Sequence, residues 1–230
     1  MADRGGHPHC ARLPAPAGPW AILAVYVVAE TLAGLAEPAL GANGTSLDAA
    51  LGYLASPLAL LLVSLGAIRW GRRGGPPTRW PGLGWAAAGL AAGVALKIGG
   101  DLLVSLEAAV LGRVPHGNNP LTMHPGSFSG AWALVCLMLA INVAAPVAEE
   151  FFFRGLLFGW LRTRLGLWSA VLVGGALFAA AHASPGLLLP LTLVGAGLCL
   201  LYERSGTLWT PVLAHAALNG LAMGAALLHP

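Results

Sequence analysis

Charged residues are scarce in this sequence. Asp, Glu, Lys and Arg together make up 9% of its 230 residues, whereas soluble domains carry about a quarter. Hydrophobic residues make up 57%, and they run in stretches long enough to cross a bilayer. This composition excludes an ordinary soluble domain, so we expect one integral membrane domain that lies in a lipid bilayer.

Basic residues are also too few, and too dispersed, for a nucleic-acid-binding protein. The net charge is only +3, and most arginines lie in short segments between apolar runs, where they indicate membrane topology. We therefore expect no nucleic-acid partner.

Cysteine is nearly absent, and its placement excludes several chemistries. Cys10, Cys136 and Cys199 are far apart and form no CxxC or CxxxH spacing. Two of them lie within apolar runs, where a small buried thiol is the simplest interpretation. The HExxH helix of common zinc proteases is missing as well, and no Ser–His or Cys–His nucleophile pair stands out.

Long apolar runs account for most of the chain. They predict an all-α fold, a polytopic transmembrane bundle of about seven helices with the N-terminus inside and the C-terminus outside. The predicted helices cover residues 20–36, 47–68, 83–111, 130–161, 167–183, 187–201 and 207–228. We divide this single membrane domain into a flexible cytoplasmic tail at 1–19, helices one to three with their loops at 20–129, and four catalytic helices at 130–228.

The orientation follows from the arginines. Residues 69–80 carry four arginines flanked by tryptophans, which is typical of a cytoplasmic loop with interfacial anchors. With the N-terminus inside, nearly all loop arginines lie on the cytoplasmic side, as the positive-inside rule requires.

One apolar stretch, residues 148–157, contains three charged side chains: Glu149, Glu150 and Arg154. Each charge near the bilayer centre costs roughly 2.5–3.5 kcal/mol on insertion scales. A helix end at the interface would avoid this cost, because its charges can reach water. Apolar sequence continues on both sides, however, over 132–147 and 151–161. This favours a buried functional cluster.

The spacing of these charges predicts their pairing. Glu150 and Arg154 are four residues apart and can form an ion pair, which leaves Glu149 turned about 100° away around the helix. Arg154 would then hold Glu150 ionised and in place. Lys97 and Asp101 have the same spacing, and we expect a self-neutralising structural pair there.

Three further polar residues lie in late helices at similar predicted depths. With a rise of ~1.5 Å per residue, Glu149 lies roughly 18 Å from the cytoplasmic helix end and His182 roughly 22 Å. His215 lies roughly 12 Å and Asn219 roughly 18 Å from that end. Helices running in alternating directions thus bring these residues to a common level, which predicts one intramembrane site.

Such a site can activate water. Glu149 would act as general base and His182 would hold the water or share its proton. His215 and Asn219 would donate hydrogen bonds to the oxyanion that forms on a substrate carbonyl. The same chemistry permits a divalent metal such as zinc, held by Glu149, His182 and His215, although we favour metal-free water activation.

Two non-enzymatic alternatives stay open at this stage. The polar cluster could only hold helices together in a membrane scaffold or immunity protein, as intramembrane His and Asn often do. Intramembrane Glu and His also build ion or proton relays, but the sequence lacks the paired, broken segments of transporters.

The polar residues of the predicted intramembrane site form three motifs: EExxxR at 149–154, FxxxH at 178–182 and HxxxN at 215–219. Their order and spacing, over about residues 130–222, resemble the CPBP family of intramembrane proteases, which includes the eukaryotic CAAX prenyl endopeptidase and bacterial Abi-type proteins. The resemblance implies that Glu149 activates water with His182, while His215 and Asn219 stabilise the oxyanion. The family has been described both as metal-dependent and as glutamate-type.

The resemblance also implies a partner and a location. It implies an endopeptidase that cuts a membrane-associated peptide or protein substrate, near its C-terminus in some relatives. The short loops and compact length look bacterial, so we expect an integral protein of the bacterial inner membrane.

Overall fold

The computed structural model describes residues 18–40, 45–70, 79–112, 120–123 and 127–228. Every regular element in these ranges is a helix, which confirms the predicted all-α class. The elements in chain order are α1 (Pro19–Leu40), α2 (Ser46–Gly52), α3 (Ala55–Trp70), α4 (Leu83–Leu111), α5 (Pro120–Met123), α6 (Ala131–Leu139), η1 (Ala140–Ala144), α7 (Ala145–Glu150), η2 (Phe151–Phe158), α8 (Gly159–Arg162), α9 (Leu167–Ala181), η3 (Pro185–Leu187), α10 (Leu188–Ser205) and α11 (Trp209–Leu228).

The predicted helices agree closely with these elements. The third predicted helix has the bounds of α4, and the second is interrupted by a turn between α2 and α3. Most of the predicted N-terminal tail lies outside the described residues. Among the described helices, four are long and apolar enough to cross a membrane: Ser46–Ile68, Ala131–Arg162, Pro185–Ser205 and Trp209–Leu228.

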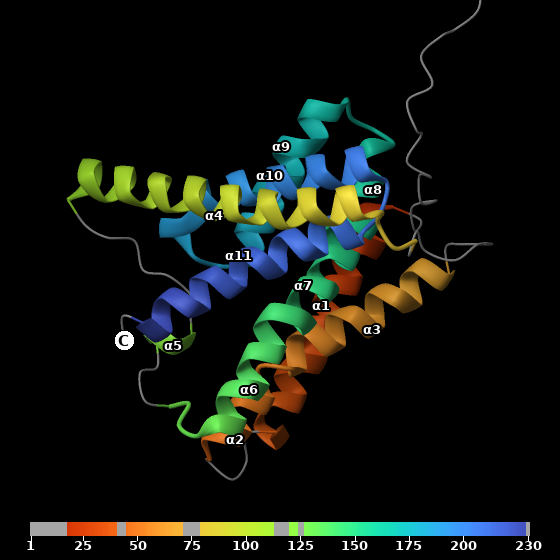
Figure 1. Cartoon of the computed structure of the whole chain (residues 1–230). Coiled ribbons are helices and arrows are strands. Elements are labelled where there is room, and N and C mark those ends of the chain that lie inside the picture. The colour runs from red at the N-terminus through yellow and green to blue at the C-terminus, as the bar shows by residue number, and fades with distance from the viewer. Residues whose placement is uncertain (1–17, 41–44, 71–78, 113–119, 124–126, 229–230) are drawn as a thin grey trace, which may run out of the picture.

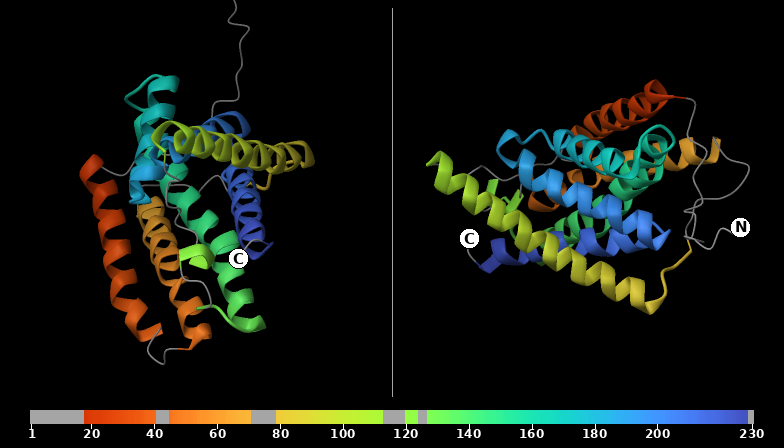
Figure 2. Two further views of the ribbon diagram at one scale, coloured as in Figure 1. Left: turned by 90° about the vertical axis from the view of Figure 1, so that its left-hand side faces the viewer. Right: turned by 90° about the horizontal axis from the view of Figure 1, so that it is seen from above.

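One long helix, Ala131–Arg162, lies at the centre of the fold. It contains α6, η1, α7, η2 and α8 in succession. α1 and α3 pack together, and α3 lies against α7 and η2. On the other side, α9 and α10 contact η2 and α11 contacts α7, while α4 covers α10 and α11 from outside (Figures 1 and 2). The central helix therefore lies between the pair α1 and α3 on one side and the helices α9, α10 and α11 on the other.

The central helix departs from α-helical geometry on both sides of the Glu-Glu pair. η1 precedes the pair by one turn and η2 follows it directly, and both are π-helical. Such segments are rare in proteins as a whole, but many of those that occur lie at functional sites. The wider turn redirects side chains and leaves carbonyls unpaired. The sequence predicts a continuous helix here and gives no sign of the π turns.

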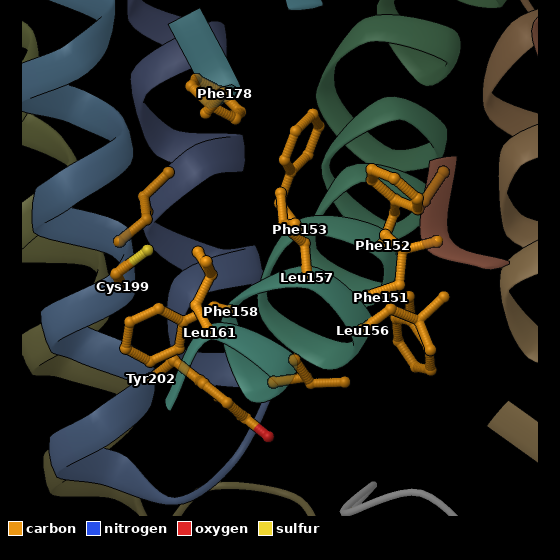
Figure 3. Close-up of a cluster of buried hydrophobic side chains, with 14 of the residues drawn as sticks. Phe151, Phe152, Phe153, Leu156, Leu157, Phe158, Leu161, Phe178, Cys199 and Tyr202 are labelled. Atoms are coloured by element: carbon orange, nitrogen blue, oxygen red, sulfur yellow. The ribbon is translucent and has the colours of Figure 1, made fainter. Parts of the chain in front are cut away.

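Apolar packing holds η2 in place. All eight of its residues are buried, because helices surround this segment instead of covering one face. Figure 3 shows the aromatic and aliphatic side chains of η2 directed toward its neighbours, with Phe178 of α9 above Phe153. The Phe153 and Phe178 ring centroids are 5.1 Å apart in an edge-on arrangement. This packing fixes the position of the charged turn that precedes η2.

Close backbone contact joins α9 to α10. A Cβ atom on Gly195 would lie 2.8 Å from the Cα of Gly175, so only glycine permits this approach. Small residues at helix interfaces allow such contacts in membranes. The contact brings the backbone of α10, including the Gly195 carbonyl, close to the central helix.

Candidate active site

Glu150 and Arg154 form the buried part of the site. Both side chains are fully buried, and the Arg154 Nη1 lies 2.9 Å from the Glu150 Oε1. This confirms the predicted ion pair. Arg154 Nη2 also donates to the Gly195 carbonyl at 3.0 Å, and the guanidinium lies 4.7 Å from the centre of the Phe178 ring. The pair therefore ties η2 to α9 and α10.

His215 extends this pair to α11. Its Nδ1 lies 2.8 Å from the Glu150 Oε1, the oxygen that also accepts from Arg154. A carboxylate paired with arginine can only accept, so the His215 Nδ1 carries a proton and donates it. In the neutral ring, the other nitrogen, Nε2, then presents a lone pair. Glu150 thus sets the tautomer of His215, as a buried orienting carboxylate does.

Glu149 lies on the other side of the same helix turn. Its Oε2 is 3.9 Å from the His182 Nε2 and 4.0 Å from the His215 Nε2. This oxygen is buried and has no hydrogen-bond partner among the described residues. The structure therefore brings together Glu149, His182 and His215, which the sequence analysis placed at a common depth.

His182 differs from its predicted placement inside a helix. It is the C-cap of α9, one residue beyond the last helical residue, Ala181. Its Nδ1 is 2.9 Å from the Phe178 carbonyl, which can only accept, so Nδ1 donates and Nε2 presents its lone pair toward Glu149. Ala183, which follows, has a φ of 49°, so the chain turns away immediately after His182.

Asn219 contacts the central helix at a different place from Glu149. Its Nδ2 donates at 2.9 Å to the carbonyl of Ile141, within η1, about 12 Å before Glu149 along the helix at 1.5 Å per residue. One of its two amide protons therefore holds α11 against η1. Asn142 donates to the Met138 carbonyl of its own helix at 2.9 Å, which is a packing role.

A cavity of 160 Å³ opens beside Glu149 and His182. The four helices predicted to be catalytic, at 130–228, form only one side of this cavity. α1 and α3 supply its other wall, since α3 packs against α7 and η2, and α1 packs against α3. The lining residues from these two helices are Tyr26, Glu30, Ser56, Pro57 and Leu60.

Sequence reasoning missed this second wall. None of Tyr26, Glu30 and Ser56 was among the predicted site residues. Ser56 donates a hydrogen bond to Glu30 at 3.1 Å, which joins α3 to α1. Tyr26 and Glu30 are four residues apart, and this spacing puts them on one helical face. That spacing was visible in the sequence, but nothing in it connected this face to Glu149.

The spacing of the polar atoms does not fit a zinc ion well. Zinc holds nitrogen and oxygen ligands at about 2.0–2.2 Å, which puts tetrahedral ligands about 3.4 Å apart. The distances from Glu149 to the two histidines, 3.9 and 4.0 Å, are wider. No group of three or more His, Cys, Asp or Glu side chains within the described ranges is placed to hold a metal ion. A bridging water molecule fits distances of this size better, since hydrogen bonds of about 2.8 Å span them.

Comparison with known proteins identifies the segment that carries this site. Residues 131–221, less than half of the chain, match the family model of type II CAAX prenyl endopeptidase Rce1-like proteins. This segment, which we call the Rce1-like domain after the model that it matches, is similar to proteases of the CPBP family. This domain contains all three motifs.

A bacterial relative of the Rce1-like domain supports the same assignment. The chain is 30% identical over 87 residues to a proposed membrane peptidase, YdiL of Bacillus subtilis (strain 168). The match covers 38% of this chain and 36% of YdiL, so the chain aligns with about a third of that relative's length. No solved structure gives a significant match to the chain. α1 and α3, which complete the cavity, lie outside the Rce1-like domain.

Proposed function

We propose that this protein is an intramembrane endopeptidase that hydrolyses a peptide bond of a membrane-associated substrate, near the substrate's C-terminus. One observation carries the proposal. A buried carboxylate oxygen of Glu149 without a hydrogen-bond partner in the described structure faces two imidazole nitrogens, and each of those rings uses its other nitrogen to donate elsewhere. Acceptors directed at one place suit a hydrogen-bond donor, and a water molecule there can donate one hydrogen bond to Glu149 and a second to an imidazole nitrogen.

In the proposed reaction, Glu149 accepts one proton from water while the water oxygen bonds to the substrate carbonyl carbon. His182 Nε2 accepts the second O–H hydrogen bond and orients the attack. The carbonyl π electrons move to oxygen and form an oxyanion. When the carbon–nitrogen bond breaks, the proton held by Glu149 passes to the leaving nitrogen, which gives an acid and an amine.

The buried network has a positioning role in this proposal. Glu150 holds the His215 ring, and Arg154 holds Glu150. Glu150 keeps the proton of His215 on Nδ1, and so keeps the lone pair of Nε2 directed at Glu149 and the water site. Asn219 has a positioning role as well, because its bond to the Ile141 carbonyl holds α11 against η1. The wide ligand spacing supports a mechanism without a metal ion.

The distinction from a purely structural cluster rests on Glu149. A scaffold needs paired polar groups, because an unpaired buried one costs roughly 1–3 kcal/mol without any gain. Glu150 and Arg154 are paired with each other through Oε1 and Nη1, although the Glu150 Oε2 and the Arg154 Nε have no partner in the described structure. Glu149 differs because its unpartnered oxygen faces two imidazole nitrogens beside a cavity. Keeping such a group is consistent with a catalytic site, where unpaired and perturbed groups collect.

The first experiment compares membranes that contain the wild-type protein with membranes that contain Glu149→Ala, by mass spectrometry of peptide termini. We expect a small set of new termini that depend on Glu149. The matched control is Glu107→Gln on α4, a helix that packs on α10 and α11 away from the cavity. We expect this variant to keep all the cleavages.

Other results would contradict the proposal. Termini that are identical in the wild type and in Glu149→Ala, with both proteins inserted to equal amounts, would favour the scaffold or immunity role. Loss of cleavage after treatment with a zinc chelator, with recovery on adding zinc, would overturn the metal-free mechanism but keep the protease.

We further propose that the protein resides in a bacterial inner membrane with its N-terminus in the cytoplasm. The arginine distribution supports this orientation. Fusing a reporter that is active only in the cytoplasm to each terminus tests it, and we expect activity from the N-terminal fusion alone.

A further inference from the structure

The cavity beside Glu149 presents one wall that the proposed mechanism has not used. Glu149, Phe153 and His182 line the wall nearest the water site, and Tyr26, Glu30 and Ser56 line the wall across from it. Neither His215 nor Asn219, the two expected oxyanion donors, is among the residues that line it. A substrate carbonyl in this cavity would therefore meet α1 and α3 on the side away from Glu149.

An oxyanion needs hydrogen-bond donors, and few polar groups on this cavity can donate. The lone pair of the His182 Nε2 accepts, because the Nδ1 of the same ring donates to a backbone carbonyl. The Ser56 hydroxyl is used in its bond to Glu30. The Tyr26 hydroxyl is the remaining side-chain donor among the residues named in the lining.

The Tyr26 hydroxyl is weakly held where it is. It donates to the Ala181 carbonyl at 3.4 Å, whereas O–H···O bonds are commonly about 2.7–2.8 Å long. A hydroxyl with such a long bond can turn toward a better acceptor at little cost. Ala181 is the neighbour of His182, so this position lies directly beside the proposed water site.

We propose that Tyr26 is a catalytic residue whose O–H donates a hydrogen bond to the oxyanion formed on the substrate carbonyl. The inference rests on the proposed peptidase function. Donors aimed at a developing oxyanion in a water-poor site are worth about 10²–10³-fold in rate. Tyr26 keeps its proton throughout, so the proton balance through Glu149 does not change.

The rest of α1 fits this placement. The Tyr26 ring packs on Phe152 of the central helix, with ring centroids 5.4 Å apart. Phe152 is three residues after Glu149, so this contact holds the phenol close to the turn that carries Glu149. Glu30 lies about 6 Å further along α1, and its carboxylate repels an oxyanion. The carbonyl oxygen is therefore directed toward Tyr26, and the scissile nitrogen lies on the Glu30 side.

The test measures cleavage by Tyr26→Phe, which removes one oxygen and keeps the ring. The probe is a synthetic peptide that spans a bond cut by the wild-type protein in membranes. We expect kcat to fall about 10²-fold, with KM within about twofold of wild type and an unchanged Tm. The matched control is Tyr53→Phe, which should keep its kcat. The Tyr53 ring packs on Phe128, with ring centroids 5.7 Å apart, and Tyr53 is not among the residues that line the cavity.

A second measurement separates catalysis from structure. A phosphinic analogue of the same peptide carries a tetrahedral anionic centre like that of the intermediate. We expect its inhibition constant to rise in Tyr26→Phe in proportion to the loss in kcat, while binding of the uncleaved peptide to Glu149→Ala and to Glu149→Ala/Tyr26→Phe stays the same.

The outcomes are distinct. Wild-type kcat in Tyr26→Phe would overturn the role of Tyr26 and leave the peptidase standing. A lower Tm with equal weakening of peptide and analogue would show that Tyr26 only holds α1 against α9, and would also overturn it. Absence of any Glu149-dependent cleavage would overturn the peptidase proposal, and with it the inference.

Discussion

Two neighbouring glutamates on the central helix differ in burial and in hydrogen bonding, because they lie on different faces of that helix. On the face toward α10 and α11, Glu150 is fully buried and accepts hydrogen bonds from Arg154 and His215 through one oxygen. On the face toward α1 and α3, Glu149 is 22% exposed, lines a cavity, and lies 3.9–4.0 Å from two histidine nitrogens. The residues are consecutive, yet their surroundings differ completely.

This difference separates a residue that positions its neighbours, Glu150, from a residue that is suited to transfer a proton, Glu149. A charge that is paired and buried is held in one state, so it suits the task of orienting a neighbour. A carboxylate beside a cavity, without a strong partner, can accept a proton and give it up again. His215 connects the two faces, since its two ring nitrogens face Glu150 and Glu149 respectively.

The largest effect on activity is expected from the cavity face. Glu149→Gln keeps the size of the side chain but removes the base, so we expect cleavage to fall about 10²–10⁴-fold. Thermal unfolding in detergent should be unchanged or slightly delayed, because the wild-type oxygen has no partner in the described structure. A clear fall in Tm would instead place Glu149 in the structural network.

The largest effect on stability is expected from the buried face. Arg154→Met leaves Glu150 as an uncompensated buried charge, which should cost roughly 3–5 kcal/mol in the free energy of unfolding. Chemical denaturation in mixed micelles measures it. The double variant Glu150→Gln/Arg154→Met removes both charges and should recover much of the loss. Equal losses in the single and double variants would show that the cost is one of packing and not of charge.

An intermediate effect on both properties is expected at the residue that connects the faces. His215→Ala should lower cleavage about 10²-fold and stability by roughly 1–3 kcal/mol, since the Glu150 Oε1 loses one donor. Combined with Glu149→Gln, its effect on cleavage should be much smaller than the sum of the two, because residues that act as a unit are not additive. Full additivity would show that His215 and Glu149 work independently.

The smallest effect is expected from an ion pair of the same spacing on α4. Lys97 and Asp101 form the pair that the sequence predicted, but their side chains are 21% and 61% exposed. Exposed pairs of this kind contribute about 0.3–0.5 kcal/mol, so Lys97→Met should leave cleavage unchanged and shift the unfolding free energy by less than ~1 kcal/mol. An effect on the unfolding free energy as large as that of Arg154→Met would mean that the spacing of such a pair, and not its burial, determines how much it stabilises the fold.

The sequence by itself determined the helical elements and the local pairs. Apolar runs of spanning length have one structural solution in a membrane, because every backbone group must be satisfied within its own helix. Pairs such as Glu150 with Arg154 follow from the 3.6-residue helical repeat alone. Both kinds of inference use interactions within one helix, and the structure agrees with both.

Only the tertiary structure decided what lies across the cavity from Glu149. The packing of α1 and α3 against the central helix depends on contacts between distant segments, and no short spacing in the sequence encodes it. The same is true of the π turns around the Glu-Glu pair and of the contact of Asn219 with Ile141. Periodicity fixes which residues share a face of one helix, but the partner of that face is set by how the helices pack together.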